Sequence, residues 1–332
     1  MVLNKIKKIE NVYSIVKIDN SSLLVSFEKE NAVIYHSNDL GVFGETTQKL
    51  DILEVFKKND NVYFLDVWSK LFKQNKEYII PFLEDYKCTD SSQIKNHIVL
   101  YKGKIWNRKF CVYSLSKKEI LWELENISII VISDYCFSRK KTKFKARNIE
   151  TGEVLWKKTI TDDFQEAKNY KFFTVYNKVL VIAVNDSILA GYNVETGELL
   201  WSVTKTNNRN LLVDIDGKLK GVTSTGYFET EIETGIHRRI EFAPYEAINE
   251  PGWFDSQRDT FVIIDNHIIT TDFFSNRIGA FNLETLQYDW FYTEENAKGF
   301  PASRPIKYFA PYLCVIDNAD TLHIYKMNDL IA

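Results

Sequence analysis

The stretch Asn193-Val-Glu-Thr-Gly-Glu-Leu-Leu-Trp201 decides the fold, because the chain repeats it. A near-identical copy is Asn148-Ile-Glu-Thr-Gly-Glu-Val-Leu-Trp156, and looser copies occupy residues 282–290 and 115–122. A fifth copy, Ile232-Glu-Thr-Gly-Ile-His-Arg-Arg239, keeps the turn and carries arginine where the others carry tryptophan. A segment that recurs along a chain is one structural unit used several times.

The spacing of the tryptophans gives the length of this unit. From Trp122 to Trp290 the chain makes four steps with a mean length of 42 residues. Each unit combines an apolar run such as Val179–Val184, a turn, a second strand, the Glu-Thr-Gly turn and a last strand that carries tryptophan. Glycine accepts a positive φ and threonine bonds to nearby backbone, so Glu-Thr-Gly predicts a tight hairpin. A strand-rich unit of this length is typical of a propeller blade.

The repeated tryptophan has a packing explanation. A single blade cannot bury the faces of its own sheet and needs its neighbours for that. A buried indole ring covers roughly 150–250 Å² of surface, which makes it an effective filler between two sheets. We therefore predict that the four repeated tryptophans are wedges between neighbouring blades.

The order of a polar residue, a Thr-Gly turn and a tryptophan resembles the PQQ-like β-propeller repeat. The matching residues are Asn148, Thr151, Gly152 and Trp156, then Asn193, Thr196, Gly197 and Trp201, with partial matches at 282–290 and 115–122. The matches span residues 108–290. The resemblance implies the fold more than a function, because that superfamily contains quinoprotein dehydrogenases and also noncatalytic scaffold propellers. The dehydrogenases use an adjacent cysteine pair, which this chain lacks, so no PQQ is expected.

We predict an all-β chain that forms a single β-propeller domain over residues 1–332, with four-stranded antiparallel blades. The length divided by the period favours eight blades over seven. The N-terminal region has one candidate strand too many for a blade and the C-terminal region has one too few. The first strand, Lys5–Ile9, should therefore complete the last blade and close the ring. Between these ends, Leu50–Lys57 is compatible with a strand or a helix.

Long connections follow the last strand of each unit, whereas the Glu-Thr-Gly turns are short. These connections are residues 84–94, 160–171, 204–210, 243–258 and 293–305. In antiparallel blades they share one face of the molecule, and loops on a rigid scaffold commonly carry function. The connections 243–258 and 293–305 follow consecutive repeats and should therefore be neighbours. They either simply pack on each other or form a binding surface rich in aromatic and arginine anchors. The candidate partner-binding residues are Tyr245, Glu250, Trp253, Phe254, Arg258, Phe300 and Arg304.

Charge excludes a global attraction to polyanions. The net charge is −3, so no nucleic acid or membrane partner is expected. No secretion signal or lipobox cysteine is seen, and a cytoplasmic location is expected. The run Arg139–Arg147 holds six cations in nine positions, which fits a solvated hairpin or a docking stripe for an acidic partner.

Catalytic signatures are missing together from the sequence. The five histidines are scattered without metal-ligand spacing, and neither a nucleophile elbow nor a phosphate loop occurs. We expect no metal or cofactor and favour a noncatalytic, cytoplasmic protein-interaction scaffold, such as an adaptor or immunity-like partner. The alternative is a carbohydrate- or small-ligand-binding propeller, or a glycoside-active enzyme, that uses the mouth of the central channel.

Overall fold

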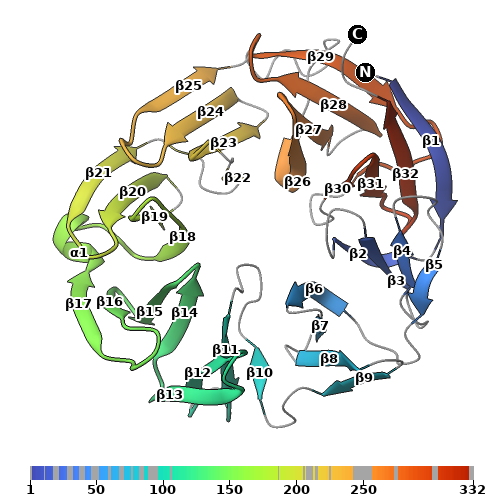
Figure 1. Ribbon diagram of the computed structural model, residues 1–332. Helices are drawn as coiled ribbons and strands as arrows, with labels where there is room; N and C mark the ends of the chain where they lie inside the picture. Colours follow the sequence, from blue (N-terminus) through green and yellow to red (C-terminus); the bar gives the residue numbers. More distant parts are fainter. Residues whose placement is uncertain are drawn as a thin grey trace.

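In the computed structural model, the described residues are 2–10, 12–17, 22–27, 33–36, 42–45, 52–58, 61–66, 71–75, 78–81, 86–88, 96–104, 107–185, 187–204, 206, 212–213, 216–223, 226–241, 256–272, 276–300 and 306–328. They form four-stranded antiparallel sheets and one short helix, α1 (Ile160–Asp163). The prediction of an all-β chain built from such sheets is confirmed. Figure 1 shows the sheets arranged around a circle, with the first strand of each near the centre and the last at the rim.

Seven sheets are continuous segments of chain, which we number as blades 1 to 7. Blades 1 to 4 contain β2 (Val12–Lys17), β3 (Ser22–Phe27), β4 (Val33–His36) and β5 (Val42–Glu45); β6 (Ile52–Lys58), β7 (Asn61–Asp66), β8 (Leu71–Asn75) and β9 (Tyr78–Pro81); β10 (Lys87–Cys88), β11 (His97–Lys102), β12 (Lys109–Ser114) and β13 (Glu119–Glu125); and β14 (Ser128–Ile132), β15 (Tyr135–Lys140), β16 (Lys143–Arg147) and β17 (Val154–Thr159). Blades 5 to 7 contain β18 (Tyr170–Tyr176), β19 (Val179–Val184), β20 (Ile188–Asn193) and β21 (Leu199–Thr204); β22 (Leu212–Val213), β23 (Lys218–Thr223), β24 (Gly226–Glu231) and β25 (His237–Glu241); and β26 (Ser256–Ile264), β27 (His267–Asp272), β28 (Arg277–Asn282) and β29 (Gln287–Thr293).

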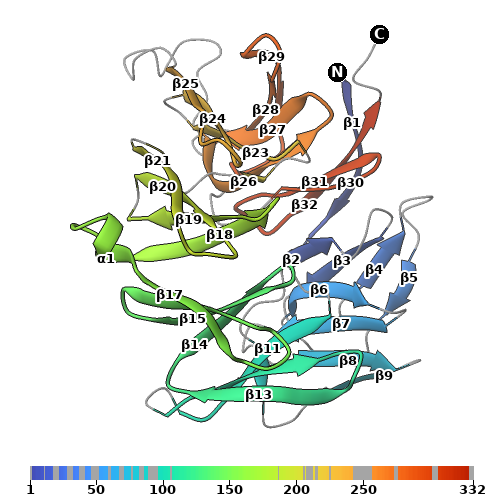
Figure 2. The ribbon, with the colours of Figure 1, turned by 60° about the vertical axis from the view of Figure 1, so that its left-hand side comes forward.

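The remaining sheet, blade 8, takes strands from both ends of the chain. It contains β30 (Lys307–Phe309), β31 (Tyr312–Ile316), β32 (Leu322–Asn328) and β1 (Val2–Ile9). Strand β1 pairs antiparallel with β32, from Val2 opposite Asn328 to Ile9 opposite Leu322. The first and last described strands, β1 and β32, accordingly lie side by side in both views (Figures 1 and 2). The segment that was compatible with strand or helix is strand β6.

The buried side chains gather between blades and not inside them. Each of six clusters of buried residues takes members from two consecutive blades. The cluster between blades 4 and 5, for example, joins Phe137 and Phe144 to Phe172 and Tyr192. Phe137 stacks on Phe172 with ring centroids 5.1 Å apart. Neighbouring blades therefore bury the sheet faces that one blade would leave exposed.

Three of the four repeated tryptophans bind the turn of the following blade. Trp122 Nε1 donates to the main-chain oxygen of Ile149 at 2.7 Å. In the same way, Trp156 donates to Val194 O at 2.8 Å at the next blade boundary, and Trp201 donates to Ile232 O at 2.9 Å at the boundary after that. The wedge prediction is confirmed for these rings, which act as hydrogen-bonded links as well as fillers.

The glycine of the Thr-Gly turn is explained by the tryptophan of the preceding blade. A Cβ atom on Gly197 would lie 2.7 Å from Trp156 Cε3, and Gly197 also has a positive φ of 78°. Gly152 and Gly235 face Trp122 and Trp201 in the same manner. Where the preceding blade lacks the tryptophan, larger residues take this position with positive φ, and these are Lys118 and Leu286. Glycine is thus required by the ring as well as by the backbone.

A β-bulge precedes each repeated tryptophan. In blade 4, Ala146 faces Trp156 while Arg147 faces Val154, so Leu155 is the extra residue. The same register shift occurs in blades 3, 5 and 7. Blade 6 carries Arg239 in place of tryptophan, and its last two strands pair without a shift. The bulge does not depend on the ring, because β4 and β5 of blade 1 show the same register shift without a tryptophan. Where the tryptophan is present, the bulge precedes it and re-aims the side chains that follow.

Candidate functional site

The antiparallel blades give the molecule two different faces. On one, here called the turn face, the tight Glu-Thr-Gly turns bond to neighbouring turns, as Val194 N does to Lys178 O at 2.8 Å. On the other, here called the loop face, the connections between blades meet the central turn of each blade. An example is Asn318 N, which donates to Gly299 O at 3.0 Å. Of the long connections identified in the sequence, residues 160–171 and the described part of 293–305 lie on the loop face.

Most of the candidate partner-binding residues lie outside the part of the chain that the structure describes. These are Tyr245, Glu250, Trp253, Phe254 and Arg304. Arg258, which the sequence analysis places in a connection, lies on strand β26 of blade 7. The grouping of the seven residues stays a prediction, and Phe300 is the member whose surroundings the structure gives in full.

Phe300 is a core residue of the loop face. Its side chain is 1% exposed and belongs to the cluster between blades 7 and 8, which includes Ile264 and Leu313. Its ring also meets the imidazole of His323 edge to face, with centroids 6.3 Å apart. Through these contacts Phe300 packs the connection between blades 7 and 8 against the sheets of both blades.

A buried polar cluster, which the sequence analysis missed, holds the start of the same connection. Glu294, at 2% exposure, accepts a hydrogen bond from the hydroxyl of Tyr325 at 2.8 Å. His323 is completely buried and its Nε2 donates to Asp317 at 3.0 Å, while its Nδ1 lies 3.8 Å from Glu294. Buried charged groups are costly unless they are paired and hydrogen-bonded, so the mutual contacts stabilise the set.

Asp317 is the best satisfied member of this cluster. Its carboxylate accepts main-chain hydrogen bonds from Ala319 at 2.8 Å and Thr321 at 3.0 Å as well as the bond from His323. Burial works to raise the pKa of Asp317, but the hydrogen bonds from His323, Thr321 and Ala319 outweigh it and lower the pKa. Asp317 is therefore held ionised, as the acceptor that fixes the central turn of blade 8. An acidic residue placed directly after the apolar run of β31 is the signal that could have revealed it.

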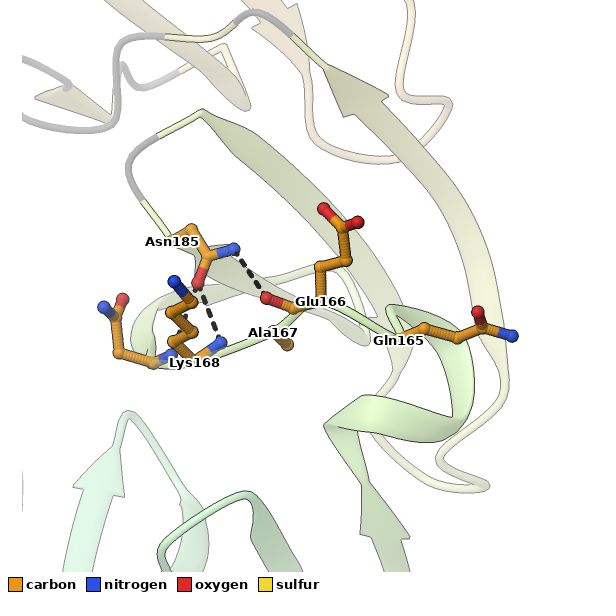
Figure 3. A pocket seen from close by; sticks show the side chains of 6 residues that line it. Gln165, Glu166, Ala167, Lys168 and Asn185 are labelled. Carbon is orange, nitrogen blue, oxygen red and sulfur yellow. Dashed lines mark hydrogen bonds between the residues drawn. The ribbon is translucent and has the colours of Figure 1, made fainter.

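A polar cavity of about 810 Å³ lies elsewhere on the loop face, between α1 and strand β18 (Figure 3). Asn185 organises its wall, since its Oδ1 accepts from Lys168 N at 3.0 Å and its Nδ2 donates to Glu166 O at 3.3 Å. The lining residues are Gln165, Glu166, Ala167, Lys168, Asn169 and Asn185. Small-molecule sites are usually lined mainly by apolar side chains, which this cavity does not offer.

Among the residues that the structure describes, no group of three or more His, Cys, Asp or Glu side chains is placed to hold a metal ion. In that same part of the chain, no helix has the length and apolar character needed to cross a membrane.

The family model described as outer membrane protein assembly factor BamB matches residues 106–218 of the chain. These residues begin just before β12 and end in blade 6, so the match includes the two clearest copies of the repeat. No curated protein matches the sequence.

Three solved structures share the architecture over nearly the whole chain. The computationally designed Ika8 protein is 10% identical, covers 97% of this chain and 98% of its own, and has a TM-score of 0.65. BamB from Moraxella catarrhalis is 10% identical over 98% of this chain and 100% of its own, with a TM-score of 0.62. Sqt1 from Saccharomyces cerevisiae is 11% identical over 99% and 100%, with a TM-score of 0.65. At these identities the likeness shows the fold.

Proposed function

We propose that the chain is a noncatalytic scaffold of the PQQ-like β-propeller repeat kind, which binds a protein partner through its loop face. The proposal is supported chiefly by the anchoring of the connection after β29. Glu294 and Phe300 hold this segment from below, one through hydrogen bonds and the other through packing. Contact residues on a rigid base lose little conformational freedom when a partner binds, which favours affinity.

The proposal divides the candidate residues into two roles. Phe300 is assigned to the anchor, because its ring is buried in the cluster between blades 7 and 8. Trp253 and Arg304 are assigned to the contact surface, since tryptophan and arginine are the side chains that most often dominate protein interfaces. The assembly-factor role named by the matching family model agrees with an interaction function.

An affinity experiment with a matched control tests this function. The purified chain is immobilised, exposed to native lysate beside a Trp253→Ala/Arg304→Ala variant, and the retained protein is identified and produced. Binding of that purified protein is then measured by calorimetry. The control is Glu284→Ala/Thr285→Ala, which removes two exposed side chains from the turn face of blade 7.

The expected result is one stoichiometric partner that binds the wild type and the control and loses about tenfold or more in affinity with the loop-face variant. Equal binding by both variants contradicts the assignment of the surface. If the wild type retains nothing specific, the scaffold function fails and a glycan-binding screen becomes the next experiment. The cytoplasmic location is part of the proposal and is tested by cell fractionation.

A further inference from the structure

Strands β15, β16 and β17 of blade 4, with the turn that joins the first two, carry a set of exposed lysines. This set, here called the lysine patch, contains Lys140, Lys141, Lys143, Lys145 and Lys157. All five side chains are exposed, and none forms an ion pair in the part of the chain that the structure describes. The neighbouring Lys158 is different, because it pairs with Asp163 at 3.0 Å.

The register of the strands places these charges against each other. Lys145 on β16 lies opposite Lys157 on β17, and Lys140 lies opposite Lys143 across the preceding turn. Like charges directly opposite each other destabilise an antiparallel pair. In blade 3 the corresponding positions are Cys111 and Glu123, and Glu123 forms an ion pair with Lys109 of the neighbouring strand. The blade architecture therefore does not require lysine opposite lysine.

The lysine patch occupies the sheet face that the core leaves free. Phe144 and Ala146 alternate with Lys143 and Lys145 along β16, and both are buried between blades 4 and 5. Side chains alternate along a strand, so the lysines turn to the opposite face of the sheet, on the side of blade 3. In Figure 1 the outer strand β17 lies at the rim of the ring, between β13 and α1.

Exposed aliphatic side chains adjoin the lysine patch on the same rim strand. Val154 and Leu155 open strand β17 and are 45% and 60% exposed. Leu155 is the bulged residue of this strand and has no partner on β16. Strand β17 thus carries Lys157 of the lysine patch two residues after the exposed Leu155.

We propose that the rim of blade 4 binds an acidic protein segment whose carboxylates meet the lysine patch and whose apolar side chains meet Val154 and Leu155. The charge of the patch is unmatched within its own blade, and an acidic segment supplies the missing partner. A nucleic acid fits less well, because the aromatic side chains of blade 4 are buried or half-buried and leave no open ring on which a base could stack. The turn of the patch, Lys140–Lys143, borders the loop face, but the surface lies on blade 4 and uses none of the residues assigned to the proposed function, so the inference goes beyond that function.

A direct binding measurement with a defined probe tests the proposal. The probe is a fluorescein-labelled peptide of alternating glutamate and leucine, followed by anisotropy, with a glutamate–serine peptide, oligo-dT and anionic vesicles as comparisons. The test variant is Lys145→Glu/Lys157→Glu, which keeps like charges opposite each other. The control is Lys118→Glu/Lys326→Glu, which makes the same charge change at exposed lysines of blades 3 and 8.

Wild type and control should bind the glutamate–leucine peptide, with weaker binding of the glutamate–serine peptide and a steep loss of affinity as salt rises. The test variant should lose about tenfold or more in affinity, because its two new glutamates would then repel the glutamates of the peptide. Lys145→Arg/Lys157→Arg should retain binding, and so should the loop-face variant Trp253→Ala/Arg304→Ala. An equal loss in test variant and control overturns the proposal, as does tighter binding to oligo-dT or vesicles than to the peptide.

Discussion

The indole Nε1 of Trp156 donates a hydrogen bond to the main-chain oxygen of Val194 at 2.8 Å, across the boundary between blades 4 and 5. The oxygen belongs to a residue at 1% exposure, immediately after the asparagine that begins the turn. One side chain therefore joins two blades by shape and by a directional bond. Trp290 occupies the same place in blade 7, but its buried Nε1 has no hydrogen-bond partner among the described residues.

This difference between Trp156 and Trp290 predicts unequal costs for the same substitution. Trp156→Phe should lower the free energy of unfolding by about 1 kcal/mol more than Trp290→Phe, because only the first removes a hydrogen bond. Chemical denaturation of both variants measures the difference. Equal losses would mean that ring volume alone accounts for the stabilisation.

Gly197 predicts a steric effect that can be separated from backbone strain. Gly197→Ala should destabilise the protein more than Gly299→Ala, although the two glycines have φ of 78° and 77°. Both changes carry the positive-φ cost of about 1–2 kcal/mol, but only the first drives a Cβ into a tryptophan ring. At Gly299 the nearest atom is Asn318 Nδ2, at 3.1 Å from the added Cβ. Thermal unfolding of the pair would contradict the explanation if Gly299→Ala were the worse variant.

The turn of blade 3 offers the reverse experiment. Lys118 takes the glycine position with φ of 59° and is exposed. Lys118→Gly should raise the free energy of unfolding by about 0.5–1 kcal/mol, since glycine adopts this φ without strain. Glu119→Gly, at the next residue and inside β13, should lower it. A destabilising effect of Lys118→Gly would show that its aliphatic stem contributes more than its backbone costs.

The sequence was sufficient for the fold class because turn chemistry and apolar alternation are local. The sequence also identified Thr-Gly as a turn. It did not explain why Lys118 and Leu286 replace glycine at the same position of two other turns. That explanation requires knowing which blade packs against which, and that relationship joins residues such as Trp156 and Gly197 across a blade boundary.

The candidate site was less accessible to sequence reasoning for a similar reason. Phe300 has the character of a binding anchor in a polar connection, yet two blades bury it. Glu294, Asp317 and His323 are separated along the chain and meet only because β29, β31 and β32 place them together. Burial of this kind is a property of the assembled ring and leaves no periodic pattern in the connection itself.

The lysine patch predicts that stability and binding respond in opposite directions. Lys157→Glu should stabilise the protein by about 0.2–1 kcal/mol, because it places an acid opposite Lys145. The same variant should bind the acidic peptide more weakly. Unfolding experiments at low and high salt measure the first effect, which should shrink as salt screens the pair. A loss of stability at low salt would contradict the electrostatic interpretation.

Asp317 predicts a dependence of stability on pH. Its pKa is lowered in the folded protein, so the stability it contributes is present above the pKa of an unfolded aspartate and is lost as pH falls through the folded value. The free energy of unfolding of wild type should therefore exceed that of Asp317→Asn near neutral pH, and the difference should disappear as the pH falls below about 4. Unfolding titrations of both proteins measure this, with the exposed Asp162→Asn as control. Parallel curves for wild type and Asp317→Asn would exclude the carboxylate as the source.

The pairing of β1 with β32 also sets the order in which the molecule can form. Strand β1 is the first described strand to be synthesised, and its partner is the last. Consecutive blades can assemble as the chain emerges from the ribosome, since their contacts are local in sequence. Strand β1 must wait with an unpaired edge until β32 has been synthesised. The pairing of β1 with β32 in blade 8 is therefore the last contact to form. Cellular folding factors would have to protect the unpaired edge of β1 until then.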